Sequence, residues 1–174
     1  MKIHTIKKIF VMHLVNHCLA GTRCFDLKRK LFRSIGYAVG NGTNIVGPVY
    51  CTGRLTIGDN CWVGRNFTVH GNGSVVIGNN CDIAPDVTIL TGGHQIGNEV
   101  RRAGSGESYT IQIGDGVWIG ARATLLGNIH IGSGSLVAAC ACVIRDVRQN
   151  MAVGGVPAKV IRDFENDVEK TTEK

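Results

Sequence analysis

The chain has 174 residues, a length that suits one domain with a continuous core and is too short for two globular units joined by a linker. Glycine supplies 24 residues, about twice its average share, while 44% of the residues are hydrophobic. This combination excludes a disordered or collagen-like chain and predicts frequent tight turns around an apolar interior.

The formal net charge of +6 is unevenly distributed. Residues 1–36 carry eight cations and one anion, whereas the remainder carries eleven cations and twelve anions. The basic segment could contact an anionic membrane surface or a phosphorylated substrate, and a solvated helix face is the simpler interpretation. Nucleic acid is not expected as a partner.

Two short helices are predicted at the start of the chain. Apolar residues recur at helical spacing between Ile6 and Val15, and polar residues interrupt this run, which is shorter than the roughly 20 residues that span a bilayer. It therefore does not predict a signal peptide or a membrane span. The second segment, Phe25 to Ile35, has one apolar face, formed by Leu27, Leu31, Phe32 and Ile35. Residues 1–39 are expected to form a basic helical segment.

From Ile45 onward an aliphatic or small apolar residue returns at every sixth position. The series is Ile45, Cys51, Ile57, Val63 and Val69, then, after a two-residue slip, Ile77, Ile83 and Ile89, and, after a longer break, Ile113, Ile119, Leu125, Ile131, Val137 and Val143. A period of six does not fit the helical 3.6 but is compatible with the strand period of two. Ordinary hairpins would not keep this spacing over so many units, so the pattern predicts a solenoid of stacked coils.

This pattern resembles the hexapeptide-repeat acyltransferases over residues 40–162. The resemblance implies an all-β fold, a left-handed parallel β-helix with three hexapeptides per turn, and a homotrimer with each active site between neighbouring subunits. Residues 40–162 would form the β-helix domain, interrupted by a loop at residues 91–110. The charged stretch from Val160 to Lys174 predicts a helical or frayed end, of which residues 163–174 form a tail beyond the domain.

The loop contains the main candidate catalytic residue. Loops that leave a rigid scaffold commonly carry function, and here His94 follows two glycines in TGGHQIG. This stretch closely resembles sugar O-acetyltransferases of the galactoside and maltose type, which implies that His94 is the catalytic base. Imidazole can accept the proton of a hydroxyl group near neutral pH as that hydroxyl attacks a thioester. Glu99 matches a loop glutamate of that family that would orient a partner or the acceptor, although pairing with Arg101 or Arg102 explains it equally well.

The resemblance also implies acetyl-CoA as the acyl donor and no metal. The segment GVPAKVIR, residues 155–162, resembles the family's closing signature. The predicted donor-binding residues are Trp118, Ala138, Ala139, Arg145, Gly154, Lys159 and Arg162. Small residues would let a pantetheine arm lie against the backbone, and the cations would contact the phosphates. Trp118 could form a wall of the groove or could pack at a trimer interface.

The acceptor is less defined. Asn66, in GRNF, matches an asparagine near the acceptor pocket of the galactoside-type enzymes, but the acidic pair that follows it there is replaced by HGNGS, residues 70–74. The basic helices and RKLFRSIG, residues 29–36, resemble capsule and lipopolysaccharide O-acetyltransferases. We therefore expect O-acetylation of a sugar or a polysaccharide precursor.

Other functions fit the same repeat. Within acyl transfer, the alternatives are a streptogramin-type antibiotic or an amino-sugar nitrogen as acceptor. Outside it, a noncatalytic β-helix subunit or a γ-type carbonic anhydrase is possible, since His94 and His130 are 36 residues apart, but Ser135 stands where the second histidine of that family's close pair is expected. Seven cysteines, an odd number without CxxC spacing, predict reduced thiols and a cytoplasmic protein.

Overall fold

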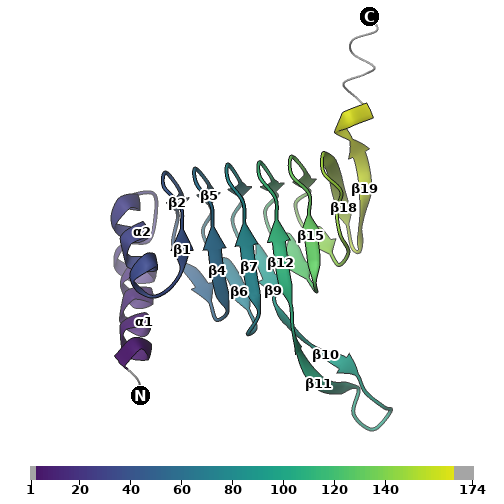
Figure 1. The fold of residues 1–174 in the computed structure, drawn as a ribbon, viewed down its shortest axis with the longest axis horizontal. Helices are drawn as coiled ribbons and strands as arrows, with labels where there is room; N and C mark the ends of the chain where they lie inside the picture. Colours follow the sequence, from purple (N-terminus) through teal and green to yellow (C-terminus); the bar gives the residue numbers. More distant parts are fainter. Residues whose placement is uncertain (1–2, 167–174) are drawn as a thin grey trace, which may run out of the picture.

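Each six-residue unit forms a short strand and a turn, and three units complete one coil of a parallel β-solenoid (Figure 1). The structure is a computed structural model that describes residues 3–166. The chain passes repeatedly from a first face to a second and then to a third, so each face is a parallel sheet whose neighbouring strands come from successive coils. These sheets account for the predicted solenoid.

The strands of the first face are β1 (Ala38–Val39), β4 (Arg54–Ile57), β7 (Ser74–Ile77), β12 (Thr110–Ile113) and β15 (Ile129–Ile131). Those of the second face are β2 (Asn44–Ile45), β5 (Trp62–Val63), β8 (Asp82–Ile83), β13 (Trp118–Ile119), β16 (Leu136–Val137) and β18 (Met151–Gly155), with β19 (Ala158–Asp163) beside β18. Those of the third face are β3 (Val49–Cys51), β6 (Phe67–His70), β9 (Thr88–Leu90), β14 (Thr124–Leu126) and β17 (Cys142–Val143).

The six-residue series forms the core. Every member from Ile45 to Val143 is at most 8% exposed. Register partners Ile113 and Ile131 are 18 residues apart, which is one coil of three hexapeptides. The partners Ile77 and Ile113 are 36 apart, which is one coil plus an insertion of 18 residues. The slip and the break in the sequence pattern are therefore insertions at turns, and they leave the buried column continuous.

Both predicted N-terminal helices are present. α1 (Ile3–His13) continues into a π-helical turn, η1 (Leu14–Cys18), and α2 (Phe25–Ser34) follows. They lie across the first coil at the N-terminal end of the solenoid (Figure 1). No helix among the described residues is long and apolar enough to cross a membrane.

The predicted apolar face of α2 is partly wrong. Phe32 is buried as expected, but Leu27 is 46% exposed and Lys28 is fully buried instead. The Lys28 ammonium donates a hydrogen bond to the carbonyl of Gly21 at 2.7 Å and lies 4.8 Å from the centre of the Phe25 ring. Burial lowers the pKa of Lys28. This lysine therefore holds the helix–loop junction together.

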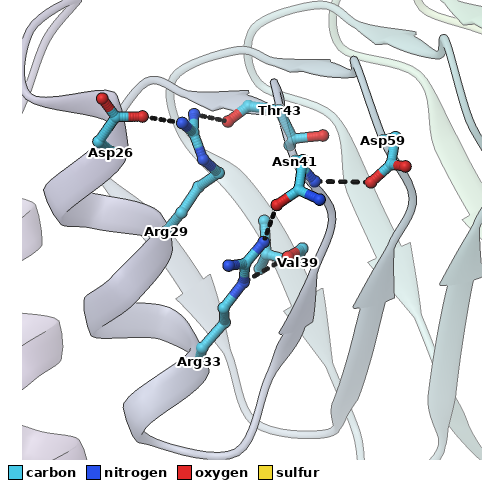
Figure 2. A network of polar contacts seen from close by, with 7 residues as sticks. All are labelled: Asp26, Arg29, Arg33, Val39, Asn41, Thr43 and Asp59. Atoms are coloured by element: carbon cyan, nitrogen blue, oxygen red, sulfur yellow. Dashed lines mark hydrogen bonds and ion pairs between the residues drawn. The ribbon is translucent and has the colours of Figure 1, made fainter.

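Two further cations of α2 bind the first coil (Figure 2). Arg29 donates to the carbonyl of Thr43 at 2.9 Å and pairs with Asp26. Arg33 donates to the carbonyl of Val39 at 2.7 Å and to the side chain of Asn41 at 3.1 Å. Arg29 and Arg33 are therefore not part of a solvated helix face, as the simpler interpretation of the basic segment had it. They donate hydrogen bonds to backbone carbonyls at the exposed N-terminal end of the solenoid.

The C-terminal end also differs from the expectation. Residues from Val160 to Asp163 belong to β19, which pairs antiparallel with β18 and is not helical or frayed. The chain reverses at residues 156–157, so β19 folds back on the edge strand of the second face and supplies it with hydrogen bonds. Most of the predicted tail, residues 167–174, lies outside the described residues.

The contacts in Figure 2 predict the effect of removing Arg33. Arg33→Met should lower the free energy of unfolding by about 1–3 kcal/mol, because the Val39 carbonyl loses its partner at a buried position. Urea denaturation followed by circular dichroism measures this change. The matched control is Arg65→Met, at an exposed position where the side chain makes no hydrogen bond to another described residue. Equal losses in the two variants would contradict a capping role for Arg33.

Candidate functional site

The break in the repeat, residues 91–110, is an antiparallel hairpin and not an irregular loop. β10 (Gly92–Ile96) pairs with β11 (Ala103–Ser108), and the hairpin projects from the solenoid between β9 and β12 (Figure 1). It leaves at the edge where the third face passes into the first. We call this edge, formed by the turns at residues 52–53 and 71–73 and by the base of the hairpin, the hairpin edge.

His94 lies on β10 with its ring oriented by the backbone. Its Nδ1 is 2.9 Å from the carbonyl oxygen of Gly104 on β11. A carbonyl can only accept, so Nδ1 is the donor in this hydrogen bond. In the neutral ring the proton is then on Nδ1, and the lone pair of Nε2 is free to accept one. The side chain is exposed, so a substrate can approach it.

A pocket of about 490 Å³ lies at the base of the hairpin. Its polar residues are His70, Asn72, His94, Glu107 and Ser108, and glycines form much of the remaining lining. At one of them, Gly71, φ is +105° and a Cβ atom would stand 2.6 Å from the backbone nitrogen of Gly92. Only glycine therefore allows the coil to approach the hairpin so closely.

A carboxylate lies on β11, the strand paired with the one that carries His94. Glu107 pairs in register with Gly93, one residue before His94, and accepts a hydrogen bond from the Tyr109 hydroxyl at 3.1 Å. Loss of hydration, together with the Glu107 carboxylate, raises the pKa of Tyr109. The phenol therefore keeps its proton and remains a donor to Glu107.

The structure separates the two other residues predicted on this side of the site. Glu99 lies in the 97–102 connection at the tip of the hairpin, away from the pocket lining, which contains Glu107 instead. Asn66 lies in the turn between β5 and β6, where its Nδ2 donates to Asp86 at 2.8 Å. Asn66 does not line the His94 pocket within the chain.

Four polar residues of the pocket were not predicted as site residues, namely His70, Asn72, Glu107 and Ser108. Glu107 could have been identified as a pocket residue by pairing the segment TGGH with the segment GES across a hairpin, which the glycines of the two segments allow. His70 and Asn72 were noted only as a replacement for an acidic pair. Their approach to His94 depends on the stacking of coils 20 residues apart, which no local pattern shows.

Most predicted donor-binding residues share one surface. Trp118, which is 55% exposed, Gly154, Lys159 and Arg162 all lie in the sheet of the second face. Ala138 and Ala139 directly follow β16 of the same sheet. A Cβ atom on Gly154 would stand 3.2 Å from the Cβ of Ala138, so the two small residues pack closely there, and Ala139 beside them is exposed. The Arg162 guanidinium lies 5.3 Å from the centre of the Phe164 ring.

Arg145 lies elsewhere, beyond the end of β17 on the third face. The donor surface and His94 also lie on different sides of the solenoid, since the hairpin leaves between the third and first faces. One chain therefore does not bring the predicted base and the predicted donor residues together.

The residues of the carbonic anhydrase alternative are also separated. His130 is on β15 of the first face in register with Gln112, and Ser135 is buried with its hydroxyl donating to the Arg148 carbonyl at 2.8 Å. Within residues 3–166, no group of three or more His, Cys, Asp or Glu side chains is arranged to hold a metal ion.

Comparison with known protein families gives two matches. Residues 110–145 match the bacterial transferase hexapeptide family, described as six repeats, and residues 54–90 match the hexapeptide repeat of succinyl-transferase. The two matched segments flank the hairpin.

Individual relatives extend the match over most of the chain. The galactoside O-acetyltransferase of Escherichia coli is 34% identical over 83% of this chain and 72% of that enzyme. A candidate acetyltransferase of Saccharomyces cerevisiae is 39% identical over 72% of this chain and 65% of that protein. The chain thus spans just under two thirds of the length of the yeast protein.

Solved structures show the same architecture. A hexapeptide-repeat acetyltransferase of Vibrio cholerae in complex with acetyl coenzyme A superposes with a TM-score of 0.80, at 25% identity over 92% of this chain and 87% of that chain. A galactoside acetyltransferase in complex with coenzyme A superposes with a TM-score of 0.77, at 30% identity over 98% and 86%. The solenoid matches the left-handed β-helix acetyltransferase fold that the sequence predicted. The chain therefore belongs to the hexapeptide-repeat acetyltransferases.

Proposed function

We propose that this protein transfers an acetyl group from acetyl-CoA to a hydroxyl of a sugar or a polysaccharide precursor, with His94 as the general base. The observation that carries the proposal is the hydrogen bond from His94 Nδ1 to Gly104, which leaves Nε2 free at a pocket beneath the hairpin. Relatives named as galactoside O-acetyltransferases support the class of acceptor.

The chemistry needs one proton acceptor. Nε2 of His94 takes the proton of the acceptor hydroxyl as its oxygen attacks the thioester carbonyl. The tetrahedral intermediate collapses, the carbon–sulfur bond breaks, and the imidazolium returns the proton to the departing sulfur. Glu107, held by Tyr109, is placed to bind a hydroxyl of the acceptor, a role that the sequence had suggested for Glu99.

The second face fits coenzyme A. Ala138, Ala139 and Gly154 have no bulky side chains, so a pantetheine arm can approach the backbone there, and the exposed Trp118 can cover one side of the arm. Lys159 and Arg162 on β19 can bind the phosphates. Arg145 can take part only if the nucleotide end extends past the turn that follows β17.

The separation of His94 from this surface supports a homotrimer. A cyclic assembly can place the hairpin of one subunit against the second face of the next, which completes each site from two chains. In that arrangement, Asn66 can contribute to acceptor binding only if a neighbouring hairpin reaches the turn between β5 and β6. The exposed cations Lys7, Arg23 and Lys30 can contact a membrane surface.

Removing the base tests the mechanism. His94→Ala should reduce acetyl transfer by roughly 100-fold or more, the usual effect of losing a general base, while coenzyme A binding is retained. Thiol release from acetyl-CoA is measured against free sugars, nucleotide sugars, amino sugars and streptogramin antibiotics. The control is His130→Ala on an exposed strand position outside the pocket. Near-full activity of His94→Ala would reject the mechanism, and transfer to an amine or an antibiotic alone would reject the acceptor class.

Mixing two inactive variants tests the shared site. His94→Ala lacks the base, and Ala138→Trp should block the donor surface. If each site uses His94 from one subunit and the donor surface from the next, random mixing of subunits restores about a quarter of the sites. Thiol release after co-refolding measures this recovery. Mixtures that remain inactive, although mixed trimers are shown by mass spectrometry, would contradict a site built from two chains.

A further inference from the structure

Two more pockets continue from the His94 pocket toward the N-terminus along the hairpin edge. The first, the cationic pocket, has a volume of about 330 Å³ and shares Asn72 with the His94 pocket. The second, the apolar groove, has a volume of about 430 Å³ and lies between α1 and β3. It shares Lys8 and Thr52 with the cationic pocket. The three pockets therefore adjoin one another in this order, and we call this row of pockets the path.

The spacing of the path follows from the coils. The turns that contain Thr52, Gly71 and Gly92 belong to successive coils, which stack about 4.8 Å apart. Thr52 is bound to the next turn, since its hydroxyl donates to the Gly71 carbonyl at 2.9 Å. A Cβ atom on Gly53 would stand 2.7 Å from the carbonyl oxygen of Gly73, so the floor of the path there is bare backbone. The cationic pocket therefore begins at Asn72, about 5 Å or one coil spacing from the hairpin base, and extends to Thr52, about 10 Å or two coil spacings away.

The cationic pocket carries two positive side chains and no carboxylate. They are Lys8 from α1 and Arg54 at the start of β4. The Lys8 ammonium lies 4.9 Å from the centre of the Tyr37 ring, and the Tyr37 hydroxyl is itself fixed by donating to the Cys51 carbonyl at 2.8 Å. Among the described residues, neither cation has a carboxylate within ion-pair distance. This arrangement suits an anion such as a phosphate ester.

The apolar groove follows directly after the two cations. Ile9, Met12, Tyr50 and Cys51 are among the residues that line it. Asn16 fixes α1 at its inner end by donating to, and accepting from, the backbone of Val49, both at 2.9 Å. α1 exposes three large apolar side chains, those of Ile6, Ile9 and Phe10, of which Ile9 lines the groove. A hydrocarbon chain that leaves the cationic pocket would thus stay in contact with apolar surface.

The order of these pockets points to an amphiphilic acceptor. We propose that the acceptor is a sugar joined through a phosphate ester to a lipid, with the sugar at His94, the phosphate at Lys8 and Arg54, and the first part of the hydrocarbon chain between α1 and β3. This inference rests on the proposed function, because it names the acceptor of the same site. A nucleotide-linked sugar would meet the cations equally well, but its base would have to occupy the apolar groove.

A binding experiment tests the lipid phosphate without knowledge of the sugar. Geranyl phosphate is titrated into the full chain by calorimetry beside geraniol, inorganic phosphate and uridine monophosphate. Geranyl phosphate should bind at least about tenfold more tightly than each of the others, because it alone uses both the cations and the groove. Equal binding of uridine monophosphate would overturn the lipid assignment.

Variants separate the two contributions. The double variant Lys8→Gln with Arg54→Gln should bind geranyl phosphate about tenfold more weakly or worse. The matched control is the double variant Lys30→Gln with Arg65→Gln, at exposed positions outside all three pockets, and its affinity for geranyl phosphate should be unchanged. Ile9→Ser should weaken the binding of geranyl phosphate more than that of inorganic phosphate, so the difference in affinity between the two ligands becomes smaller. Unchanged affinity for geranyl phosphate in the Lys8 and Arg54 double variant would overturn the proposal. The proposal would also fail if the protein bound phosphatidylglycerol vesicles and geranyl phosphate did not displace it from them.

The same probe distinguishes the inference from the proposed function. His94→Ala should bind geranyl phosphate as the unmodified chain does, and the ligand should inhibit acetyl transfer in competition with the acceptor and not with acetyl-CoA. His94-dependent transfer without binding or inhibition by geranyl phosphate would refute only the acceptor assignment. Binding of geranyl phosphate without any His94-dependent transfer would refute the proposed function.

Discussion

The in-register stacking of successive coils is the constraint on which the rest of this structure depends. Because each coil places an aliphatic residue over the same residue type below it, the backbone hydrogen bonds and the buried column reinforce each other. Insertions are tolerated only at the turns. The 18-residue hairpin is such an insertion, so His94 stands on a rigid scaffold although it lies far from the core.

The ends of the solenoid need separate solutions, because a stack of coils leaves unpaired backbone at each end. At the N-terminal end, Arg29 and Arg33 of α2 donate to carbonyls of the first coil. At the C-terminal end, β19 folds back on β18. Both devices also contribute to the proposed function, since α1 and the first coil enclose the apolar groove and β19 carries Lys159 and Arg162.

Much of the fold could be predicted from the sequence, because the repeat encodes it directly. The six-residue series and the two N-terminal helices follow from spacing, and the structure contains both, whereas the break in the series predicted a loop where the structure has a hairpin. The exposed Leu27 and the buried Lys28 were not predictable in this way, because the loop carbonyl of Gly21 that binds Lys28 is placed by tertiary contacts. The residues from Val160 onward were predicted as a helical or frayed end because many of them are charged. Those up to Asp163 instead belong to β19, and this strand depends on its pairing with β18.

The candidate site shows the same division. His94 was indicated by a local motif, and it does line a pocket. Glu107, His70 and Asn72 join it through strand pairing and coil stacking, which act between residues distant in the sequence. The predicted donor residues lie mainly on one surface, and that surface is on a different side of the solenoid from His94. This separation makes the arrangement of neighbouring subunits part of the catalytic argument.

The most direct measurement is a crystal structure of the full chain with coenzyme A bound. The account predicts a trimer in which the coenzyme lies along the second face of one subunit. Its sulfur should lie at the pocket mouth of the next subunit's hairpin, with room for one hydroxyl about 3 Å from the Nε2 atom of His94. A coenzyme bound with its sulfur remote from every His94 ring would contradict the account.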